Sequence, residues 1–182
     1  SSTATIFLDG YIKNFKIYKG VAVIPEDPTG KIQLDFDNNL NDKYGNSTWT
    51  NNGVTFDQVN SVKGHAAYFN GANKYLQSNY SFFANNISYN FDLKTNSAIP
   101  NKILRSASNA YQMIIYANGT LTLDGRFDLP VNTVLHNTYY KHEYVGKTNL
   151  SLYKLNDVVI AQSNVFTALN WNNFLIGDNG SF

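Results

Sequence analysis

Two loops of the chain combine aromatic rings with amide side chains, a mixture that can bind sugars. One covers residues 42–49 (DKYGNSTW) and the other covers residues 169–173 (LNWNN). An aromatic ring stacks on the apolar face of a sugar, and amide or carboxylate groups exchange hydrogen bonds with its hydroxyls. The predicted glycan-binding residues are Tyr44, Asn46, Trp49, Trp171 and Asn173. The alternative is that both tryptophans anchor loops at the edges of the fold, where their loss would reduce stability instead of binding.

Oxygen-bearing side chains in and just before the first loop could also hold a metal ion. Asp37, Asp42 and Asn46 offer the hard oxygen ligands that calcium prefers, and backbone carbonyls could complete the coordination. We expect such an ion to stiffen the loop and to take no part in chemistry. The alternative is a solvated loop rich in Asx turns, with no cofactor.

The acidic residues lack the spacing of a hydrolase. Glycosidases need two carboxylates at a fixed separation across the scissile bond, whereas the only glutamates, Glu26 and Glu143, lie far apart in the sequence. Asp35 and Asp37 lie two residues apart at the end of a predicted strand, where aspartates are usually solvated. We therefore predict that the protein is not an enzyme.

The histidines give no sign of catalysis either. His65, His136 and His142 lie in unrelated segments, and no G-x-S-x-G motif or metal-ligand pair accompanies them. We expect each of them to be an ordinary residue at a strand end.

Length and composition indicate one domain without a charged partner. A chain of 182 residues suits a single all-β domain with a substantial core. Charged residues make up 15% of the chain and the net charge is +1, so we expect no nucleic-acid partner. No segment has the length and apolarity of a membrane span, so we expect no membrane insertion. There is no cysteine for a disulfide or a thiolate.

The pattern of apolar residues predicts strands and almost no helix. Short runs rich in Val, Ile, Tyr, Phe and Thr recur between Asn, Gly and Asp turns. The predicted strands cover residues 11–18, 32–36, 53–57, 66–70, 74–77, 87–93, 111–116, 120–124, 139–145, 150–155 and 158–162. About a dozen strands spaced in this way predict an antiparallel sandwich of two sheets.

The turns between these strands have recognisable chemistry. Asn118-Gly119 predicts a type I′ hairpin turn, because both central positions of that turn need a positive φ. Asn156-Asp157 predicts the last tight turn. Residues 66–77 are interpreted as one hairpin, and residues 38–52 as a polar loop that holds Trp49.

Several of these segments resemble one known family of domains. They are residues 34–46 (LDFDNNLNDKYGN), 51–56 (NNGVTF), 63–71 (KGHAAYFNG), 137–142 (NTYYKH, with Tyr139 in the place of a Trp) and 152–161 (LYKLNDVVIA). With the segment 10–20 (GYIKNFKIYKG), their order resembles the laminin-G-like, concanavalin A-like jelly rolls of bacterial surface proteins and phage tail and fibre proteins. The resemblance implies an all-β, two-sheet antiparallel β-sandwich with the closing strand at the N-terminus.

The two ends of the chain resemble neighbouring pieces of that domain. Joined tail to head, residues 174–182 (FLIGDNGSF) and 10–20 would form the closing hairpin of the family. The first strand is then circularly permuted, the end of a preceding repeat, or exchanged with a neighbour. The predicted organisation is a closing strand at 1–23, a Pro-flanked connector at 24–30 and a laminin-G-like jelly roll at 31–182.

The resemblance also implies a function. It predicts a non-catalytic recognition module on a phage virion (tail, fibre or capsid appendage) or another extracellular cell surface. Its partners would be a host cell-surface glycan or polysaccharide and neighbouring copies or repeats. The alternatives are a structural spacer or decoration domain without a ligand, and a carbohydrate-binding module attached to a glycosidase. The family often has an Asp that helps to hold calcium at the position of Lys13, and the cation here disfavours that metal.

Overall fold

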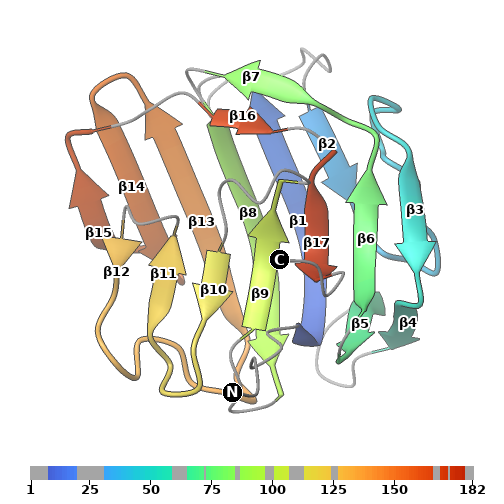
Figure 1. The fold of residues 1–182 in the computed structure, drawn as a ribbon, viewed down its shortest axis with the longest axis horizontal. Helices are drawn as coiled ribbons and strands as arrows, with labels where there is room; N and C mark the ends of the chain where they lie inside the picture. Colours follow the sequence, from blue (N-terminus) through green and yellow to red (C-terminus); the bar gives the residue numbers. More distant parts are fainter. Residues whose placement is uncertain are drawn as a thin grey trace, which may run out of the picture.

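Two antiparallel β-sheets face each other across one hydrophobic core (Figure 1). The computed structural model describes residues 8–19, 31–58, 65–71, 73–84, 87–96, 101–106, 113–123, 127–165, 169–171 and 173–178. The described residues form seventeen strands and no helix, so none of them belongs to a helix that could cross a membrane. The chain is therefore the all-β jelly-roll sandwich that the sequence predicts.

The larger sheet has the strand order β15-β14-β13-β8-β1-β5-β4, and β2 also pairs with β1. Its strands are β1 (Asp9–Lys19), β2 (Lys31–Leu34), β4 (Thr55–Gln58), β5 (His65–Asn70), β8 (Ile87–Thr95), β13 (Tyr140–Lys147), β14 (Leu150–Leu155) and β15 (Val158–Ser163). The edge strand β15 leaves Val158, Val159 and Ile160 exposed.

The smaller sheet has the order β12-β11-β10-β9-β17-β6-β3. Its strands are β3 (Trp49–Asn52), β6 (Lys74–Ser78), β9 (Asn101–Arg105), β10 (Met113–Ile115), β11 (Leu121–Leu123), β12 (Phe127–Asp128) and β17 (Leu175–Asp178). A separate pair, β7 (Phe82–Ala84) and β16 (Leu169–Trp171), lies across the top of the sandwich in Figure 1.

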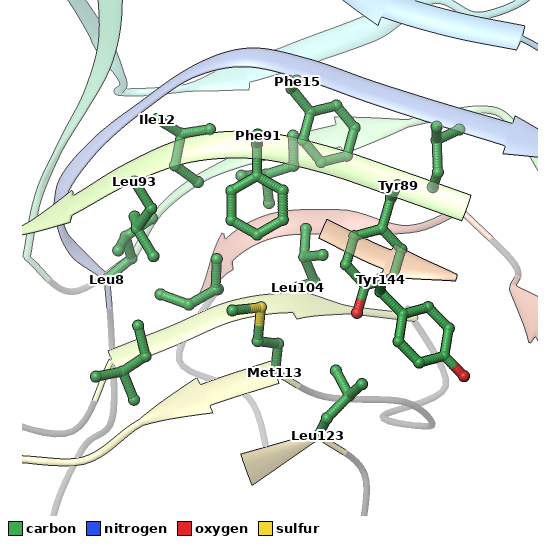
Figure 2. Close-up of a cluster of buried hydrophobic side chains, with 14 of the residues drawn as sticks. Leu8, Ile12, Phe15, Tyr89, Phe91, Leu93, Leu104, Met113, Leu123 and Tyr144 are labelled. Atoms are coloured by element: carbon green, nitrogen blue, oxygen red, sulfur yellow. The ribbon is translucent and has the colours of Figure 1, made fainter. Parts of the chain in front are cut away.

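The core forms where the alternating apolar residues of the two sheets meet (Figure 2). In β8, Tyr89, Phe91 and Leu93 are buried, and the residues between them are only half-buried. They pack with side chains of β1 and face Leu104 and Met113 of the smaller sheet. The period of two leaves every second side chain of β1 and β8 on the outer surface of the larger sheet.

Strand β1 lies in the middle of the larger sheet and confirms the strand predicted at residues 11–18. It pairs with β8 from Gly10 to Lys19, with a register shift between Lys13 and Lys16, and with β5 and β2 on its other edge. Gly10 permits this close pairing, because a Cβ at that position would lie 2.2 Å from the carbonyl oxygen of Lys94. The predicted connector at 24–30 lies outside the described residues.

The expected hairpin between the joined ends of the chain is wrong. β17 lies in the smaller sheet between β9 and β6, whereas β1 lies in the larger sheet (Figure 1). Each strand has both edges occupied by other strands, so no edge remains for the two to pair. The C-terminal and N-terminal strands therefore contribute to opposite sheets.

Two other local predictions also need correction. Residues 66–77 do not form a hairpin, since β5 belongs to the larger sheet and β6 to the smaller one. Phe69 and Leu76 both reach the same core from opposite sides, and the chain crosses between sheets near Gly71, which has a φ of 86°. Trp49 does not lie in a loop but begins β3, which pairs with β6.

The turn at Asn118-Gly119 is not of type I′. Gly119 has a φ of 75°, but Asn118 is not among the residues with positive φ. The amide of Gly119 donates to the carbonyl of Tyr116 at 2.9 Å, as in a three-residue hairpin loop that ends in a left-handed glycine. Asn156 and Asp157 have φ values of 50° and 67° and form the tight turn predicted between β14 and β15.

Candidate ligand-binding surface

The carboxylate of Asp42, a predicted calcium ligand, is surrounded by hydrogen-bond donors. Its Oδ1 accepts from the backbone amides of Gln33 and Tyr44, at 3.0 and 3.2 Å. Its Oδ2 accepts from the amides of Asn46 and Ser47 at 2.9 and 3.0 Å, and from the Ser47 hydroxyl at 3.0 Å. A carboxylate has about four lone-pair positions, so these five donors occupy all the acceptor positions of Asp42. Asp42 thus fixes the course of the loop.

The other two predicted calcium ligands point to different partners. Asp37 Oδ1 lies 3.7 Å from His65 Nδ1 and accepts from the amide of His65 at 3.3 Å. The side-chain amide of Asn46 donates to the carbonyl of Lys31 at 2.8 Å. The described residues also contain no group of three or more His, Cys, Asp or Glu side chains that could hold a metal. The calcium site at Asp37, Asp42 and Asn46 stays a prediction.

Trp49, a predicted sugar platform, packs inward. Its ring contacts Phe174 edge-on with centroids 5.0 Å apart, and Phe15 in the same manner at 6.2 Å. Its indole N–H donates to the Ser47 hydroxyl at 2.8 Å. The packing favours the loop-anchor alternative for Trp49, because the half-buried ring contacts two aromatic residues of the core.

The remaining predicted binding residues are divided between two places. Tyr44 is half-buried in the loop ordered by Asp42, where the ammonium of Lys31 lies 5.8 Å from its ring centroid. Asn173 is exposed, and its amide donates to the Ser81 hydroxyl at 3.1 Å. The backbone of Trp171 pairs with β7, and its side chain lies outside the described part of the structure. The sugar-binding role of these residues stays a prediction.

A different cluster stands out on the outer surface of the larger sheet. Ile12 of β1 and Leu93 of β8 are paired and point into the core, so their neighbours point outward. We define the tyrosine–lysine surface as the outward residues of β1, β5 and β8 that meet here, together with Tyr139: Tyr11, Lys13, Tyr68, Asp92, Lys94 and Tyr139. No feature of the sequence marked these residues together, because they come from four separate segments.

Rings and ammonium groups alternate along this surface. Tyr68 stacks on Tyr11 with centroids 4.6 Å apart. The ammonium of Lys94 lies 4.7 Å from the centroid of Tyr11 and 5.5 Å from that of Tyr139. The ammonium of Lys13 lies 4.6 Å from the centroid of Tyr139. These distances are within the range of cation–π attraction, which holds the lysine chains over the rings.

Lys13 is the least accessible charged group of this surface. It is 5% exposed, and burial lowers its pKa while the negative charge of Asp92 opposes that shift. Among the described residues, Lys13 has no hydrogen bond or ion pair with a carboxylate; Asp92 itself accepts from the side-chain amide of Asn14 at 2.5 Å. Lys13 was singled out in the sequence as a departure from the family pattern, and that departure was the available signal for this surface.

Tyr139 lies between the two lysines and remains a neutral phenol at physiological pH. Burial raises the pKa of Tyr139 to about 12, with smaller contributions from Tyr11 and Asp92. Its hydroxyl is buried and finds no hydrogen-bond partner among the described residues. The site thus keeps its positive charges without an internal phenolate to neutralise them.

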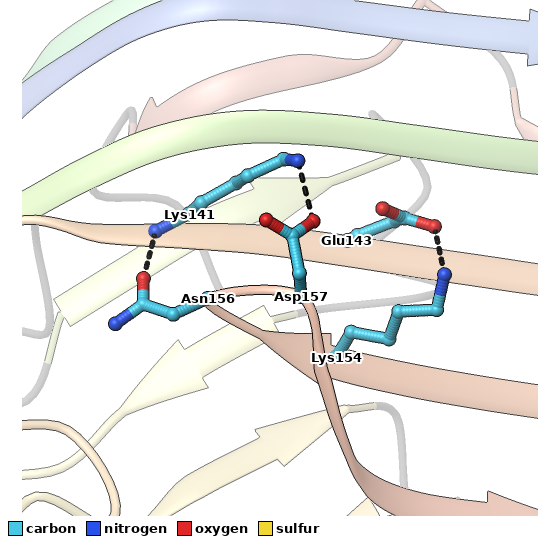
Figure 3. Close-up of polar contacts among 5 residues, drawn as sticks. All are labelled: Lys141, Glu143, Lys154, Asn156 and Asp157. Atoms are coloured by element: carbon cyan, nitrogen blue, oxygen red, sulfur yellow. Dashed lines mark hydrogen bonds and ion pairs between the residues drawn. The ribbon is translucent and has the colours of Figure 1, made fainter.

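The lysines next to this surface have carboxylate partners (Figure 3). Lys141 Nζ lies 2.6 Å from Asp157, and Lys154 Nζ lies 2.7 Å from Glu143. The hydrogen bond to Asp157 raises the pKa of Lys141. Lys13 and Lys94 differ from these two lysines, because their ammonium groups lie over tyrosine rings and not beside a carboxylate.

A second, smaller feature lies at the turn between β10 and β11. Tyr116, Ala117, Asn118 and Thr120 line an open depression of about 390 Å³. Tyr116 is 37% exposed there and is accompanied by an amide side chain. The described residues that line it supply an aromatic ring and polar groups, and none of them is charged.

The histidines occupy three unrelated environments, as the sequence predicts, but one of them is not an ordinary strand-end residue. His142 is fully buried in the middle of β13, and its Nδ1 is hydrogen-bonded to the Tyr153 hydroxyl. Burial lowers the pKa of His142 to about 3. His142 is a neutral core residue, because residue 142 falls on the inward side of its strand.

The fold defines the chain as a jelly-roll β-sandwich. No protein-family model and no curated protein matches it. Among solved structures it is similar to the carbohydrate-binding module CBM66 from Bacillus subtilis, with 13% sequence identity and a TM-score of 0.41 over 72% of this chain and 92% of that one.

Proposed function

We propose that the chain is a non-catalytic recognition module that binds a glycan through the tyrosine–lysine surface. The observation that carries the proposal is the row in which Tyr11, Lys94, Tyr139 and Lys13 follow one another at 4.6–5.5 Å. Aromatic rings supply apolar contact with sugar rings, and ammonium groups donate hydrogen bonds to sugar oxygens. A sheet surface holds both kinds of group in fixed positions, which lowers the entropy lost on binding.

Two of the described carboxylates are engaged in structural contacts, which supports a role without catalysis. Glu143 is paired with Lys154, and Asp42 is filled by loop donors. A glycosidase would need one carboxylate that accepts or donates a proton and a second that attacks or activates water. Both of these carboxylates serve the structure instead.

The setting of the module follows from the laminin-G-like resemblance of the sequence. We place it on a virion or another extracellular surface, where it would recognise a polysaccharide of a host cell. A carbohydrate-binding module attached to a glycosidase is compatible with the same surface. A structural spacer in a tandem array is the alternative in which the surface has no ligand.

The proposal is tested on an array of bacterial polysaccharides and mammalian glycans. We expect the wild-type protein to bind a defined subset, and Tyr11→Ala and Lys94→Ala to lose that binding with little change in melting temperature. Tyr116→Ala and Trp171→Ala serve as controls at the other candidate positions and should bind normally. Loss of binding in these controls alone would indicate that the glycan binds at Tyr116 or Trp171 and not on the larger sheet. A blank array with folded protein would favour the spacer.

A further inference from the structure

We propose that the ligand of the tyrosine–lysine surface is an acidic glycan, whose carboxylate or phosphate group binds beside Lys94 and Lys13. This inference rests on the proposed function and names the chemistry of its ligand. It starts from the difference between the lysines that have a carboxylate partner and those that have none.

Two other lysines of this sheet have carboxylate partners: Lys141 and Lys154 each contact a carboxylate within 2.7 Å. The ammonium groups of Lys13 and Lys94 instead lie over tyrosine rings and form no ion pair with a described residue. Lysines unpaired with any described residue also occur elsewhere on this sheet, at Lys16 and Lys147, but only these two lie together beside aromatic rings. Among the described residues that form this surface, the two positive charges are accompanied by one carboxylate, that of Asp92, which already accepts a hydrogen bond from Asn14.

The position of Lys13 adds an independent argument. Its side chain is more than nine-tenths buried and lacks a hydrogen bond to any described residue. Most of this side chain is therefore buried, while its ammonium is not among the buried polar atoms that lack a partner and so keeps contact with solvent. Partial burial strengthens its attraction for an anion, and an anion bound next to it would supply a charged partner.

The geometry assigns different roles to the two lysines. Tyr11 of β1 pairs with Lys94, and Lys13 pairs with Asp92 two positions further along, so both lysines lie on the same side of β1 and β8. Lys94 is half-buried and can contact a ligand directly. Lys13 is a positioning residue: its ammonium lies against the ring of Tyr139 and strengthens the positive potential beside Lys94, since partial burial weakens the screening by solvent.

A confined patch of this kind suits an acidic polysaccharide better than a nucleic acid or an anionic membrane. The chain as a whole has a net charge of only +1, so attraction over long distances is weak. The alternating tyrosine rings supply contacts for sugar rings between successive charges. The repeated acidic group of a polysaccharide then binds at one defined point.

Binding to immobilised polymers at low and high salt tests the inference. The probes are hyaluronan and polygalacturonate for carboxylates, a glycerol-phosphate teichoic acid for phosphate, dextran as the neutral polymer, and double-stranded DNA. We expect one acidic class to bind, dextran and DNA not to bind, and added salt to weaken the complex. The two acidic arms distinguish a carboxylate from a phosphate ligand.

Charge-neutral variants of matched shape identify the residues. Lys94→Met should weaken binding by about tenfold or more, because a charged hydrogen bond is lost. Lys94→Arg, which keeps the positive charge, should retain most of the wild-type affinity. Lys13→Met should weaken binding and also flatten its salt dependence, a change that a purely structural lysine would not produce. Lys141→Met and Lys154→Met remove lysines that already have partners and should leave binding unchanged. Thermal melts confirm that each variant is folded.

Other outcomes overturn the inference in distinguishable ways. Binding to dextran as strong as to the acidic polymers, with no effect of salt or of Lys94→Met, would reject the anionic ligand while the glycan proposal survives. Binding to DNA alone would replace the glycan by another polyanion. No binding to any polymer or array glycan would reject the proposed function together with its ligand.

Discussion

The ring of Trp49 meets the ring of Phe174 edge-on, with their centroids 5.0 Å apart. Trp49 begins β3 and Phe174 directly precedes β17, two strands that both pair with β6. The contact therefore joins two strands of the smaller sheet from inside the sandwich. This contact favours a structural role for Trp49, whose part in sugar binding stays a prediction.

Replacement of Trp49 should reduce stability and leave binding intact. We expect Trp49→Ala to lower the free energy of unfolding by about 2–4 kcal/mol, since a partly buried indole is replaced by a cavity. Trp49→Phe, which keeps a ring but loses the hydrogen bond to Ser47, should cost about 1 kcal/mol. Urea denaturation measures both values. Tyr44→Ala, at a half-buried loop position, is the control and should cost less. A Trp49→Ala protein of native stability that no longer binds glycan would contradict this assignment.

Asp42 should stabilise the folded state through the hydrogen bonds that its carboxylate accepts, without a metal ion. Asp42→Asn removes the charge that holds donors from four residues, and hydrogen bonds to charged groups contribute about 1.5–3 kcal/mol each. Because neighbouring bonds are not additive, we expect a total loss of about 3 kcal/mol. Asp37→Asn, which affects one exposed contact with His65, should change the stability much less.

Thermal melts of the wild-type protein and of these variants measure the losses and also test calcium binding. The melting temperature of the wild-type protein should not change when EDTA or millimolar calcium is added, because the oxygens of Asp42 are already occupied by donors. A clear rise with calcium that disappears in Asp42→Asn would show that the loop rearranges to bind the ion.

His142 should make the fold sensitive to acid. Its pKa is about 3 in the folded protein and about 6.5 in an unfolded chain, so protonation favours the unfolded state. The contribution to stability is complete above about pH 6.5 and falls as the pH drops toward 3. The slope is about 1.4 kcal/mol per pH unit.

A neutral replacement isolates this effect from the titration of carboxylates. His142→Asn keeps an acceptor or donor near the Tyr153 hydroxyl and cannot titrate. Between pH 6.5 and 5, the stability of this variant should fall less steeply than that of the wild-type protein. Equal slopes in the two proteins would mean that His142 gains a proton without unfolding.

Strand β1 should be indispensable because it pairs on both edges. We expect residues 20–182 alone to lack a cooperative unfolding transition, since β8, β5 and β2 would all lose their partner. With β1 in its own sheet, the complete chain should be a monomer in multi-angle light scattering at high concentration. A stable dimer that separates only on unfolding would instead indicate that the strand is exchanged between copies.

The local pattern of the sequence was sufficient for the class of fold and for most long strands. β8, β13 and β14 alternate buried and less buried residues, and this period of two is visible without knowledge of their neighbours. β9 was missed because all five of its residues are buried, Lys102 and Arg105 among them, so it shows no alternation and carries charges. β7, β12 and β16 were missed because two or three residues are too few to show a period.

The all-β sandwich and the tight turn at Asn156-Asp157 could be predicted from local patterns, since backbone propensity and side-chain alternation act over a few residues. The type of the turn at Asn118-Gly119 and the path of residues 66–77 could not. The tertiary structure decided which sheet each strand joins and where single side chains point. In the folded chain Trp49 packs against the core, and Asp42 accepts hydrogen bonds from the amides of its own loop. Lys13, Lys94 and Tyr139 lie next to one another. The physical reason is that these contacts join residues far apart in the chain, and only the pairing of distant strands sets their distance.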